Sequence, residues 1–180
     1  MFIGYPPICD HFWGIRHKRR KGRKIANADT ALFKPELVFF DMECKDREDF
    51  FNLLHDKLVA MGYIQDTWYE GITTREKNYP TGLRCGAAEI AIPHTDPQHL
   101  KKPYIAIIKP KTPVRFEHMA GVDDDVDAEL IINLGVERDG GQVAVLQNLM
   151  NIFMNDDAVK DIMSQTTAEG LIESITSRFE

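Results

Sequence analysis

Residues 90–96 read Ile90-Ala91-Ile92-Pro93-His94-Thr95-Asp96, and they are the most informative part of the sequence. An apolar run over residues 87–92 has the length of a buried strand. It stops at Pro93 because proline has no N–H to donate to a neighbouring strand. His94 is therefore predicted at the carboxyl end of a core strand, which is the end where open α/β sheets place their ligands.

On both sides of this stretch, the chain contains further apolar runs of strand length that are bounded by turn residues. These runs cover residues 37–40, 104–108 and 130–134. Helical patterns lie between the run 37–40 and the run 87–92, and again after residue 134. The sequence therefore predicts an α/β domain with a small central mixed β-sheet flanked by helices.

The helical stretches have apolar residues three and four positions apart. Three side chains are predicted N-caps: Asp46, Asn155 and Thr167. Gly62 is placed to end the first helix. A second helix over residues 66–77 is predicted to have Trp68, Ile72 and Arg75 near one face. In the C-terminal third, one predicted helix packs on the core through a stripe of five residues: Val143, Leu146, Leu149, Met150 and Phe153.

The composition indicates one domain that works in solution. A chain of 180 residues with 43% hydrophobic and 28% charged side chains is long enough for one proper core. No run approaches the roughly 20 apolar residues of a membrane-spanning helix. Three cysteines without paired spacing indicate reduced thiols, as in a cytoplasmic protein, rather than a disulfide framework or a zinc site.

The charges divide the chain into two parts. The first thirty residues contain seven Lys and Arg against two Asp, whereas the rest contains fifteen against twenty-six Asp and Glu. An acidic domain argues against nucleic acid as its main ligand. We expect residues 1–33 to be an irregular, poorly ordered basic leader, with a nucleic-acid or membrane-surface tail as the alternative. Residues 34–180 are the predicted functional domain.

The surroundings of His94 suit nucleophilic chemistry. Neutral imidazole is a good nucleophile near pH 7, and its attack on a phosphoryl donor gives a phosphoramidate that retains transfer potential. Arg75 is the candidate to hold phosphate oxygens, because guanidinium engages them through two parallel hydrogen bonds. The turn Pro80-Thr81-Gly82 is predicted to bring N–H groups and the Thr81 hydroxyl to the same point. Thr95 is predicted to support the site as well.

Other interpretations of these residues stay open. His94, Asp96 and His99 are all metal-ligand types within six residues, although their spacings fit no recognised metal site. Arg75, at a helix end, also suits the role of a cation that complements the helix dipole. We favour a site with no metal and no cofactor.

Two motifs in this region resemble a known family. The pattern R-E-x-x-x-P-T-G-L begins at Arg75, and I-A-I-P-H-T-D begins at Ile90. Together they resemble the enzyme IIA domain of bacterial sugar phosphotransferase systems, of the fructose/mannitol type. Pro97-x-His99 and Gln147-Asn148-Leu149-Met150 are similar to its galactitol-specific branch. The resemblance covers the chain except its leader, and it implies a fold like that of the phosphotransferase/anion transport proteins.

The resemblance implies a cytoplasmic phosphotransferase component with a phosphohistidine at His94, assisted by Arg75. The implied donor is the histidine-containing phosphocarrier protein. The implied acceptor is a cysteine of enzyme IIB, which links the carrier peripherally to a membrane transporter, enzyme IIC, for galactitol-like sugar uptake. Many members have a second histidine where Gln142 stands here, and a glutamine amide donates hydrogen bonds but does not titrate. The alternative is a regulatory, phosphorylation-sensing module of the nitrogen-related enzyme IIA kind.

Overall fold

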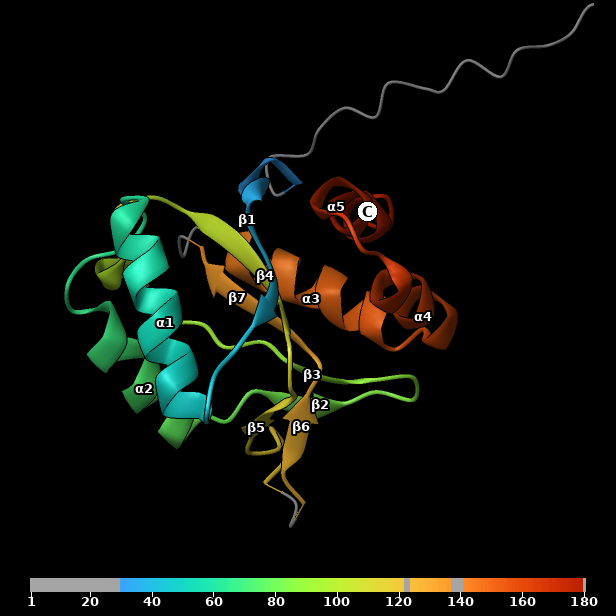
Figure 1. Cartoon of the computed structure of the whole chain (residues 1–180), viewed down its shortest axis with the longest axis horizontal. Coiled ribbons are helices and arrows are strands. Elements are labelled where there is room, and N and C mark those ends of the chain that lie inside the picture. The colour runs from blue at the N-terminus through green and yellow to red at the C-terminus, as the bar shows by residue number, and fades with distance from the viewer. Residues whose placement is uncertain (1–29, 122–123, 137–140, 180) are drawn as a thin grey trace, which may run out of the picture.

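The computed structural model describes residues 30–121, 124–136 and 141–179 (Figure 1). At its centre is a five-stranded sheet with the strand order β1-β4-β7-β3-β2. The strands are β1 (Phe33–Met42), β2 (Gly82–Arg84), β3 (Glu89–Ala91), β4 (Tyr104–Pro110) and β7 (Leu130–Gly135). β1 is parallel to β4 and β3 is parallel to β7, whereas the pairs β4–β7 and β2–β3 are antiparallel. The predicted mixed sheet is confirmed.

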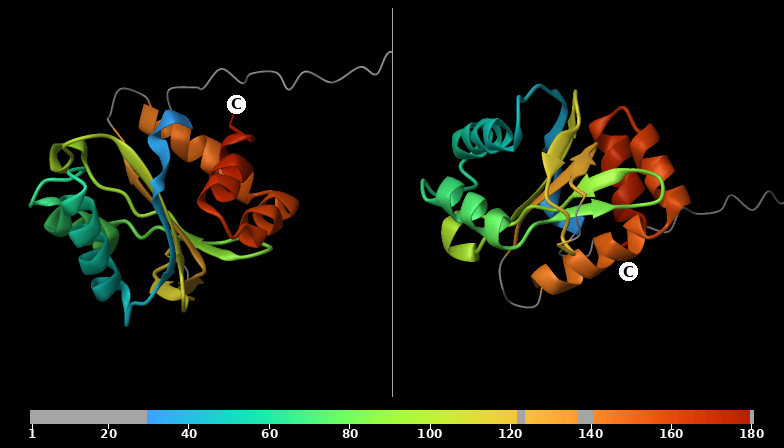
Figure 2. Two further views of the ribbon diagram at one scale, coloured as in Figure 1. Left: turned by 45° about the horizontal axis from the view of Figure 1, so that its top comes forward. Right: turned by 90° about the horizontal axis from the view of Figure 1, so that it is seen from below.

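Helices cover both faces of this sheet (Figure 2). On one face lie α1 (Arg47–Ala60) and α2 (Trp68–Asn78), and on the other lie α3 (Gly141–Phe153), α4 (Asp156–Ser164) and α5 (Ala168–Thr176). Successive side chains of a strand point to opposite faces. In β4, Ala106 therefore packs into the core beneath α1 and α2, and Ile107 packs into the core beneath α3, α4 and α5. Burial on both faces explains why β4 and β7 are apolar along most of their length.

The local signals for helix ends are confirmed. The side chains of Asp46, Asn155 and Thr167 each accept a hydrogen bond from the backbone N–H three residues later, as N-caps do. Gly62 follows α1 with a φ of 70°, a conformation that favours glycine.

The stripe predicted for α3 is wrong at its first residue. Val143 is 69% exposed, whereas Val145, Leu149 and Ile152 are buried. A helix turns through roughly 100° per residue, so Val143 lies about 200° around the axis from Val145. The face that packs on the sheet is therefore set by residues 145, 149 and 152, and Val143 points away from it.

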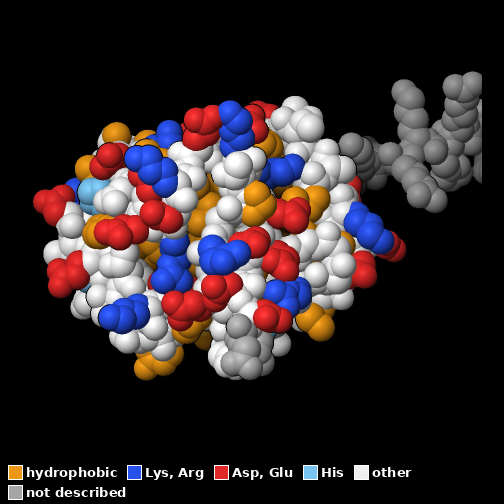
Figure 3. Space-filling view, turned by 60° about the horizontal axis from the view of Figure 1, so that its bottom comes forward, with side chains coloured by type: hydrophobic (Ala, Val, Ile, Leu, Met, Phe, Trp, Pro, Cys, Tyr) orange, Lys and Arg blue, Asp and Glu red, His pale blue; other side chains and the backbone are white. Residues whose placement is uncertain are grey.

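Three short strands were not predicted. β2 pairs with β3, and β5 (Val114–Phe116) forms an antiparallel pair with β6 (Val126–Ala128). Each has three residues, which is too short for an apolar pattern to stand out. Ion pairs cross these strands, including Arg115 with Asp127 at 3.0 Å and Arg84 with Glu89 at 2.7 Å. Figure 3 shows acidic and basic side chains interspersed on the face seen there.

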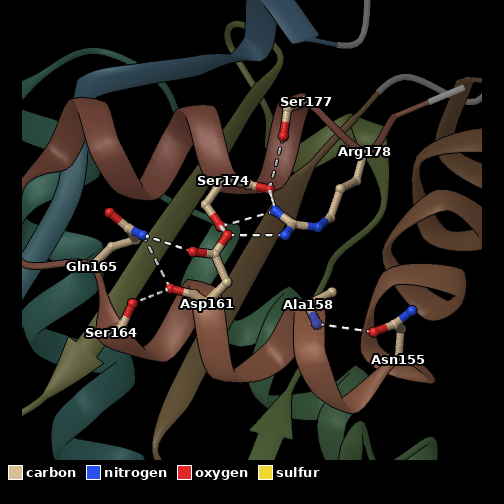
Figure 4. Close-up of polar contacts among 8 residues, drawn as sticks. All are labelled: Asn155, Ala158, Asp161, Ser164, Gln165, Ser174, Ser177 and Arg178. Carbon is tan, nitrogen blue, oxygen red and sulfur yellow. Dashed lines mark hydrogen bonds and ion pairs between the residues drawn. The ribbon is translucent and has the colours of Figure 1, made fainter.

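A polar cluster joins α4 to α5 near the C-terminus (Figure 4). We call it the α4–α5 cluster; its members are Asp161, Gln165, Ser174 and Arg178. The Asp161 carboxylate accepts hydrogen bonds from the Ser174 hydroxyl at 2.7 Å and the Gln165 amide at 3.1 Å, and it pairs with Arg178 at 2.9 Å. The Ser174 bond, followed by that from Arg178, lowers the pKa of Asp161 below its ordinary value of 3.8.

Among the described residues, no helix is both long and apolar enough to cross a membrane. Residues 1–29 of the predicted leader lie outside the described part of the chain. Of its last four residues, Thr30–Leu32 form a short 3-10 helix and Phe33 begins β1.

Candidate functional site

His94 lies just beyond the carboxyl end of β3, as the strand–proline–histidine pattern predicts. β3 ends at Ala91, and the chain then runs beside β7. The backbone N–H of Leu134 donates to the Pro93 carbonyl over 3.0 Å, and His94 forms a parallel bridge with Leu134. Pairing with β7 thus fixes the backbone that carries the half-buried His94 side chain.

The two ring nitrogens of His94 have different partners. Nδ1 lies 2.9 Å from the carbonyl oxygen of Ile92. Because a carbonyl only accepts hydrogen bonds, Nδ1 carries the proton in the neutral ring. Nε2 is then the nitrogen with the lone pair, and it lies 2.5 Å from a terminal nitrogen of the Arg75 guanidinium. The nucleophilic atom is therefore presented to a fixed positive charge.

The environment of His94 favours its neutral form. Burial lowers the pKa of His94 below its ordinary value of 6.5, and the positive charge of Arg75 lowers it as well. The hydrogen bond to the Ile92 carbonyl and the charge of Asp96 act in the opposite direction on the same pKa. A neutral imidazole with one fixed tautomer is the form that attacks an electrophile.

Arg75 reaches His94 from the last turn of α2. Its guanidinium lies 5.4 Å from the ring centroid of Tyr79, in a cation–π contact. The Tyr79 ring is 66% exposed. A guanidinium has five N–H donors in a planar fork, so Arg75 has further donors for the oxygens of an anion placed at Nε2.

The buried face of α2 differs from the prediction. It consists of Trp68, Ile72 and Glu76, and Arg75 stands at its flank. The helical spacing of four from Ile72 points to Glu76, but a glutamate in a helix is usually exposed, and we did not predict its burial.

Glu76 holds the turn between α2 and β2. Its carboxylate accepts the backbone N–H and the hydroxyl of Thr81, each at 2.9 Å. Burial raises the pKa of Glu76, and these two hydrogen bonds oppose that rise. The Thr81 carbonyl in turn accepts the Ile92 N–H at 3.2 Å. The Thr81 hydroxyl, expected beside His94, is thus directed at Glu76, and Thr81 supports the site through its backbone.

Two further residues, Thr95 and Gln142, were predicted to support the site. Thr95 is 1% exposed, and its hydroxyl has no hydrogen-bond partner among the described residues. Gln142 belongs to the first turn of α3, as expected, but its side chain lies outside what the structure describes.

The alternative metal site gains no support. The Nδ1 atom of His99 lies 2.9 Å from the Thr67 hydroxyl, and its Nε2 atom lies 3.2 Å from the Gln98 amide. His94 is occupied by Arg75 and the Ile92 carbonyl, as described above. Within the described part of the chain, no three His, Cys, Asp or Glu side chains are grouped so as to hold a metal ion.

Comparison with known proteins gives concordant matches. Residues 31–178 match the family described as phosphoenolpyruvate-dependent sugar phosphotransferase system, EIIA 2. The galactitol-specific EIIA component of Escherichia coli (strain K12) is 31% identical over 119 residues, which cover 66% of this chain and 79% of that protein.

Two solved structures show the same fold. The nitrogen regulatory protein IIA-Ntr of Neisseria meningitidis matches with a TM-score of 0.67 and 24% identity, over 81% of this chain and 97% of that chain. Enzyme IIAMTL of Escherichia coli, solved in complex with phosphorylated enzyme IIBMTL, matches with a TM-score of 0.63 and 21% identity, over 80% of this chain and 96% of that chain.

The family match spans the five-stranded sheet and the helices α1 to α5 of the described residues, including the segment from Arg75 to His94. Components of this family are phosphotransferases with a phosphohistidine intermediate. This chain therefore belongs to the EIIA 2 family of the phosphoenolpyruvate-dependent sugar phosphotransferase system, of the fructose/mannitol type, and is a phosphotransferase component.

Proposed function

We propose that this protein is a cytoplasmic phosphoryl carrier that accepts phosphate on Nε2 of His94 from the histidine-containing phosphocarrier protein. It passes the phosphate to a cysteine of enzyme IIB, which serves uptake of a galactitol-like sugar through the membrane component IIC. The observation that carries this proposal is the orientation of His94. Nδ1 is bound to the Ile92 carbonyl, and Nε2 is presented to Arg75.

In the first transfer, the Nε2 lone pair of His94 attacks the phosphorus of the donor's phosphohistidine. The new N–P bond forms as the donor's N–P bond breaks, and the donor imidazole leaves with that electron pair. His94 keeps its Nδ1 proton, which the Ile92 carbonyl holds. Arg75 turns its donors from Nε2 to the equatorial phosphate oxygens, where charge spreads in the transition state.

In the second transfer, a cysteine thiolate of enzyme IIB attacks the same phosphorus. The N–P bond on His94 breaks, and its electron pair returns to Nε2. His94 is again neutral with its proton on Nδ1, ready for another cycle. Because Nδ1 already carries a proton, the ring leaves phosphorus as neutral imidazole, which is a good leaving group.

Three further residues complete the proposed site. Gln142, in the first turn of α3, is proposed to donate its amide to a phosphate oxygen. The Thr95 hydroxyl, buried and without a partner among the described residues, is proposed to support the loop at His94. Thr81 supports the same loop through Ile92. The galactitol-specific relative supports the choice of sugar class.

Labelling with radioactive phosphoenolpyruvate, enzyme I and the phosphocarrier protein tests the proposal. We expect an acid-labile, alkali-stable phosphate on the protein and none on His94→Ala. His99→Ala is the matched control, because His99 is bonded to Thr67 and is expected to label normally. Labelling of His94→Ala would overturn the assignment. Deleting residues 1–29 is expected to leave labelling intact, because the proposed carrier domain is residues 34–180.

Discharge of the label separates transport from regulation. Adding enzyme IIB of a galactitol-type system is expected to move the phosphate from the protein to IIB. If the label stays on the protein with every IIB tested, the regulatory function replaces the transport function, and His94 keeps its role as the acceptor.

A further inference from the structure

Asn133 is a polar residue in the middle of an otherwise apolar strand. All six residues of β7 are buried, and Asn133 is 0% exposed. Its side-chain amide nitrogen donates to the carbonyl of Pro93 at 3.0 Å, and its side-chain oxygen accepts from the hydroxyl of Tyr104 at 2.7 Å. The Pro93 carbonyl only accepts, so the nitrogen of Asn133 must face it and Tyr104 must be the donor.

Tyr104 is held in place for this contact. It lies opposite Gly135 in the β4–β7 pair, and a Cβ at Gly135 would overlap its ring. Glycine therefore lets the ring lie across the strand and reach Asn133. Tyr104 is 0% exposed, and burial raises the pKa of its phenol, so the group keeps its proton and remains a donor.

The hydrogen bonds that run from Tyr104 through Asn133 end at the peptide bond between Pro93 and His94. The Pro93 carbonyl accepts two hydrogen bonds, from the Asn133 amide and from the Leu134 N–H, each at 3.0 Å. A peptide group is planar, so fixing its carbonyl fixes the direction in which the backbone of His94 begins. On the other side of Pro93, the Ile92 carbonyl accepts a hydrogen bond from the Nδ1–H group of His94. Both peptide planes that flank Pro93 are thus fixed.

The stability of the fold gives little reason for such a pair. Two polar groups buried in an apolar layer cost free energy unless they are bonded, and a bonded pair is worth about as much as an apolar pair of the same shape. What distinguishes Asn133 from an apolar residue is a directional hydrogen bond: its amide is a second donor to the Pro93 carbonyl, beside the Leu134 N–H.

We propose that Asn133 and Tyr104 are positioning residues for phosphoryl transfer at His94. They hold the Pro93–His94 peptide so that Nδ1 stays on the Ile92 carbonyl and Nε2 stays aimed at the incoming phosphorus. This inference rests on the proposed function of His94 and extends it into the core, to two side chains that do not touch the reacting atoms.

The variants that test this are Tyr104→Phe, Asn133→Leu and the double variant. Leucine has the branched shape of asparagine, so the double variant replaces both polar groups with apolar ones of similar form. We expect each variant to lower the turnover number for phosphorylation by about 10- to 100-fold, because a displacement of the reacting groups by about 1 Å reduces the rate on that scale. The KM for the phosphocarrier protein is expected to stay unchanged, because the surface is unaltered.

A second measurement needs no phosphate at all. Correlating ring protons with ring nitrogens by NMR reports which nitrogen of His94 carries the proton. We expect the unmodified protein to give the Nδ1-protonated form and the variants to give a mixture of both tautomers. Should the unmodified protein fail to accept phosphate, the proposed function falls, while this measurement still decides whether Asn133 and Tyr104 hold the ring.

Ser174→Ala is the matched control, because it removes a buried polar contact in the α4–α5 cluster. It is expected to leave the turnover number and the tautomer unchanged. Urea unfolding identifies the variants that are folded, and Tyr104→Phe, which removes one oxygen atom, serves if the double variant is not. A folded variant with unchanged turnover and an unchanged Nδ1 tautomer would overturn the proposal.

Discussion

Two regions of the molecule, the surroundings of His94 and the α4–α5 cluster, use polar side chains in different ways. Five polar or charged residues are buried among those described: Glu76, Thr81, Thr95, Asn133 and Ser174. The first four adjoin His94 or connect to it through the Ile92 and Pro93 backbone. Ser174 is the fifth, and it belongs to the α4–α5 cluster, where the side chains of Asp161 and Arg178 are 43% and 33% exposed.

This difference indicates what each set of contacts is for. Near His94, hydrogen bonds away from water restrict the backbone and the ring of one nucleophile, which is what preorganisation for a reaction requires. In the α4–α5 cluster, half-exposed groups join two helices at a surface where water weakens each charge pair. We therefore expect changes near His94 to alter phosphoryl transfer most, and changes in the cluster to alter stability alone.

The largest difference in phosphorylation rate is expected when one arginine in each region is replaced by glutamine in separate variants. Arg75→Gln removes the positive charge at Nε2 of His94, and the initial rate of phosphorylation should fall about 100- to 1000-fold, as on removal of a donor to transition-state charge. Arg178→Gln removes a comparable side chain from the cluster and should leave that rate unchanged. Quench-flow labelling of both variants measures the rates. Equal rates would show that Arg75 contributes no more to phosphoryl transfer than Arg178 does.

The cluster should show the opposite behaviour. Asp161→Ala is expected to lower the free energy of unfolding while the phosphorylation rate stays unchanged. Since the pKa of Asp161 is lowered from 3.8, its contribution is present above pH 3.8 and is lost as pH falls through the lowered value. Urea unfolding at pH 7 and in acid measures this.

The matched control is Asp157→Ala on the same helix, whose carboxylate is 97% exposed. It should change stability less than Asp161→Ala at pH 7. A loss of phosphorylation rate in folded Asp161→Ala would show that the cluster is coupled to the site.

Local signals explain what the sequence predicted. The helix ends at Asp46, Gly62 and Thr167 depend on neighbours in the chain, and so does the end of β3 at Ala91, two residues before Pro93. Such features are readable because the interacting groups are three or four residues apart. The approach of Arg75 to His94 follows from the chain order of the two motifs, which the turn at Thr81 brings together.

The remaining features depend on contacts that a single sequence does not display. Asn133 reads as a polar interruption of an apolar run, because its partners Tyr104 and Pro93 are 29 and 40 residues away in the chain. Glu76 reads as a solvent-exposed helix residue until Thr81 is seen to cover it. β5 and β6 become strands only by pairing with each other.

A smaller effect is expected for Glu76, whose contribution to stability should change with pH in the opposite direction to that of Asp161. Its pKa is raised by burial, so the folded protein holds the proton more tightly than the unfolded chain. The stability associated with protonated Glu76 is present below pH 4.5 and is lost as pH rises through the raised value. Glu76→Gln is neutral throughout, so the difference in unfolding free energy should shift in its favour as pH rises above 4.5.

Urea unfolding of the two proteins at several pH values measures this shift. Glu70→Gln, at an exposed position of the same helix, is the control. If the stability of Glu76→Gln followed the same pH course as that of the unmodified protein, Glu76 would not be the group responsible.

The smallest effect concerns the ionisation of His94 itself. Because burial and Arg75 lower its pKa below 6.5, its ring should stay neutral into mildly acidic solution, and NMR titration of the ring measures this. Arg75→Gln should raise that pKa, whereas Asp96→Asn should lower it further, because the charge of Asp96 favours the protonated ring. Arg178→Gln should leave it unchanged. Opposite shifts from Arg75 and Asp96 would show that local charges, rather than burial alone, set the acidic limit at which His94 still accepts phosphate.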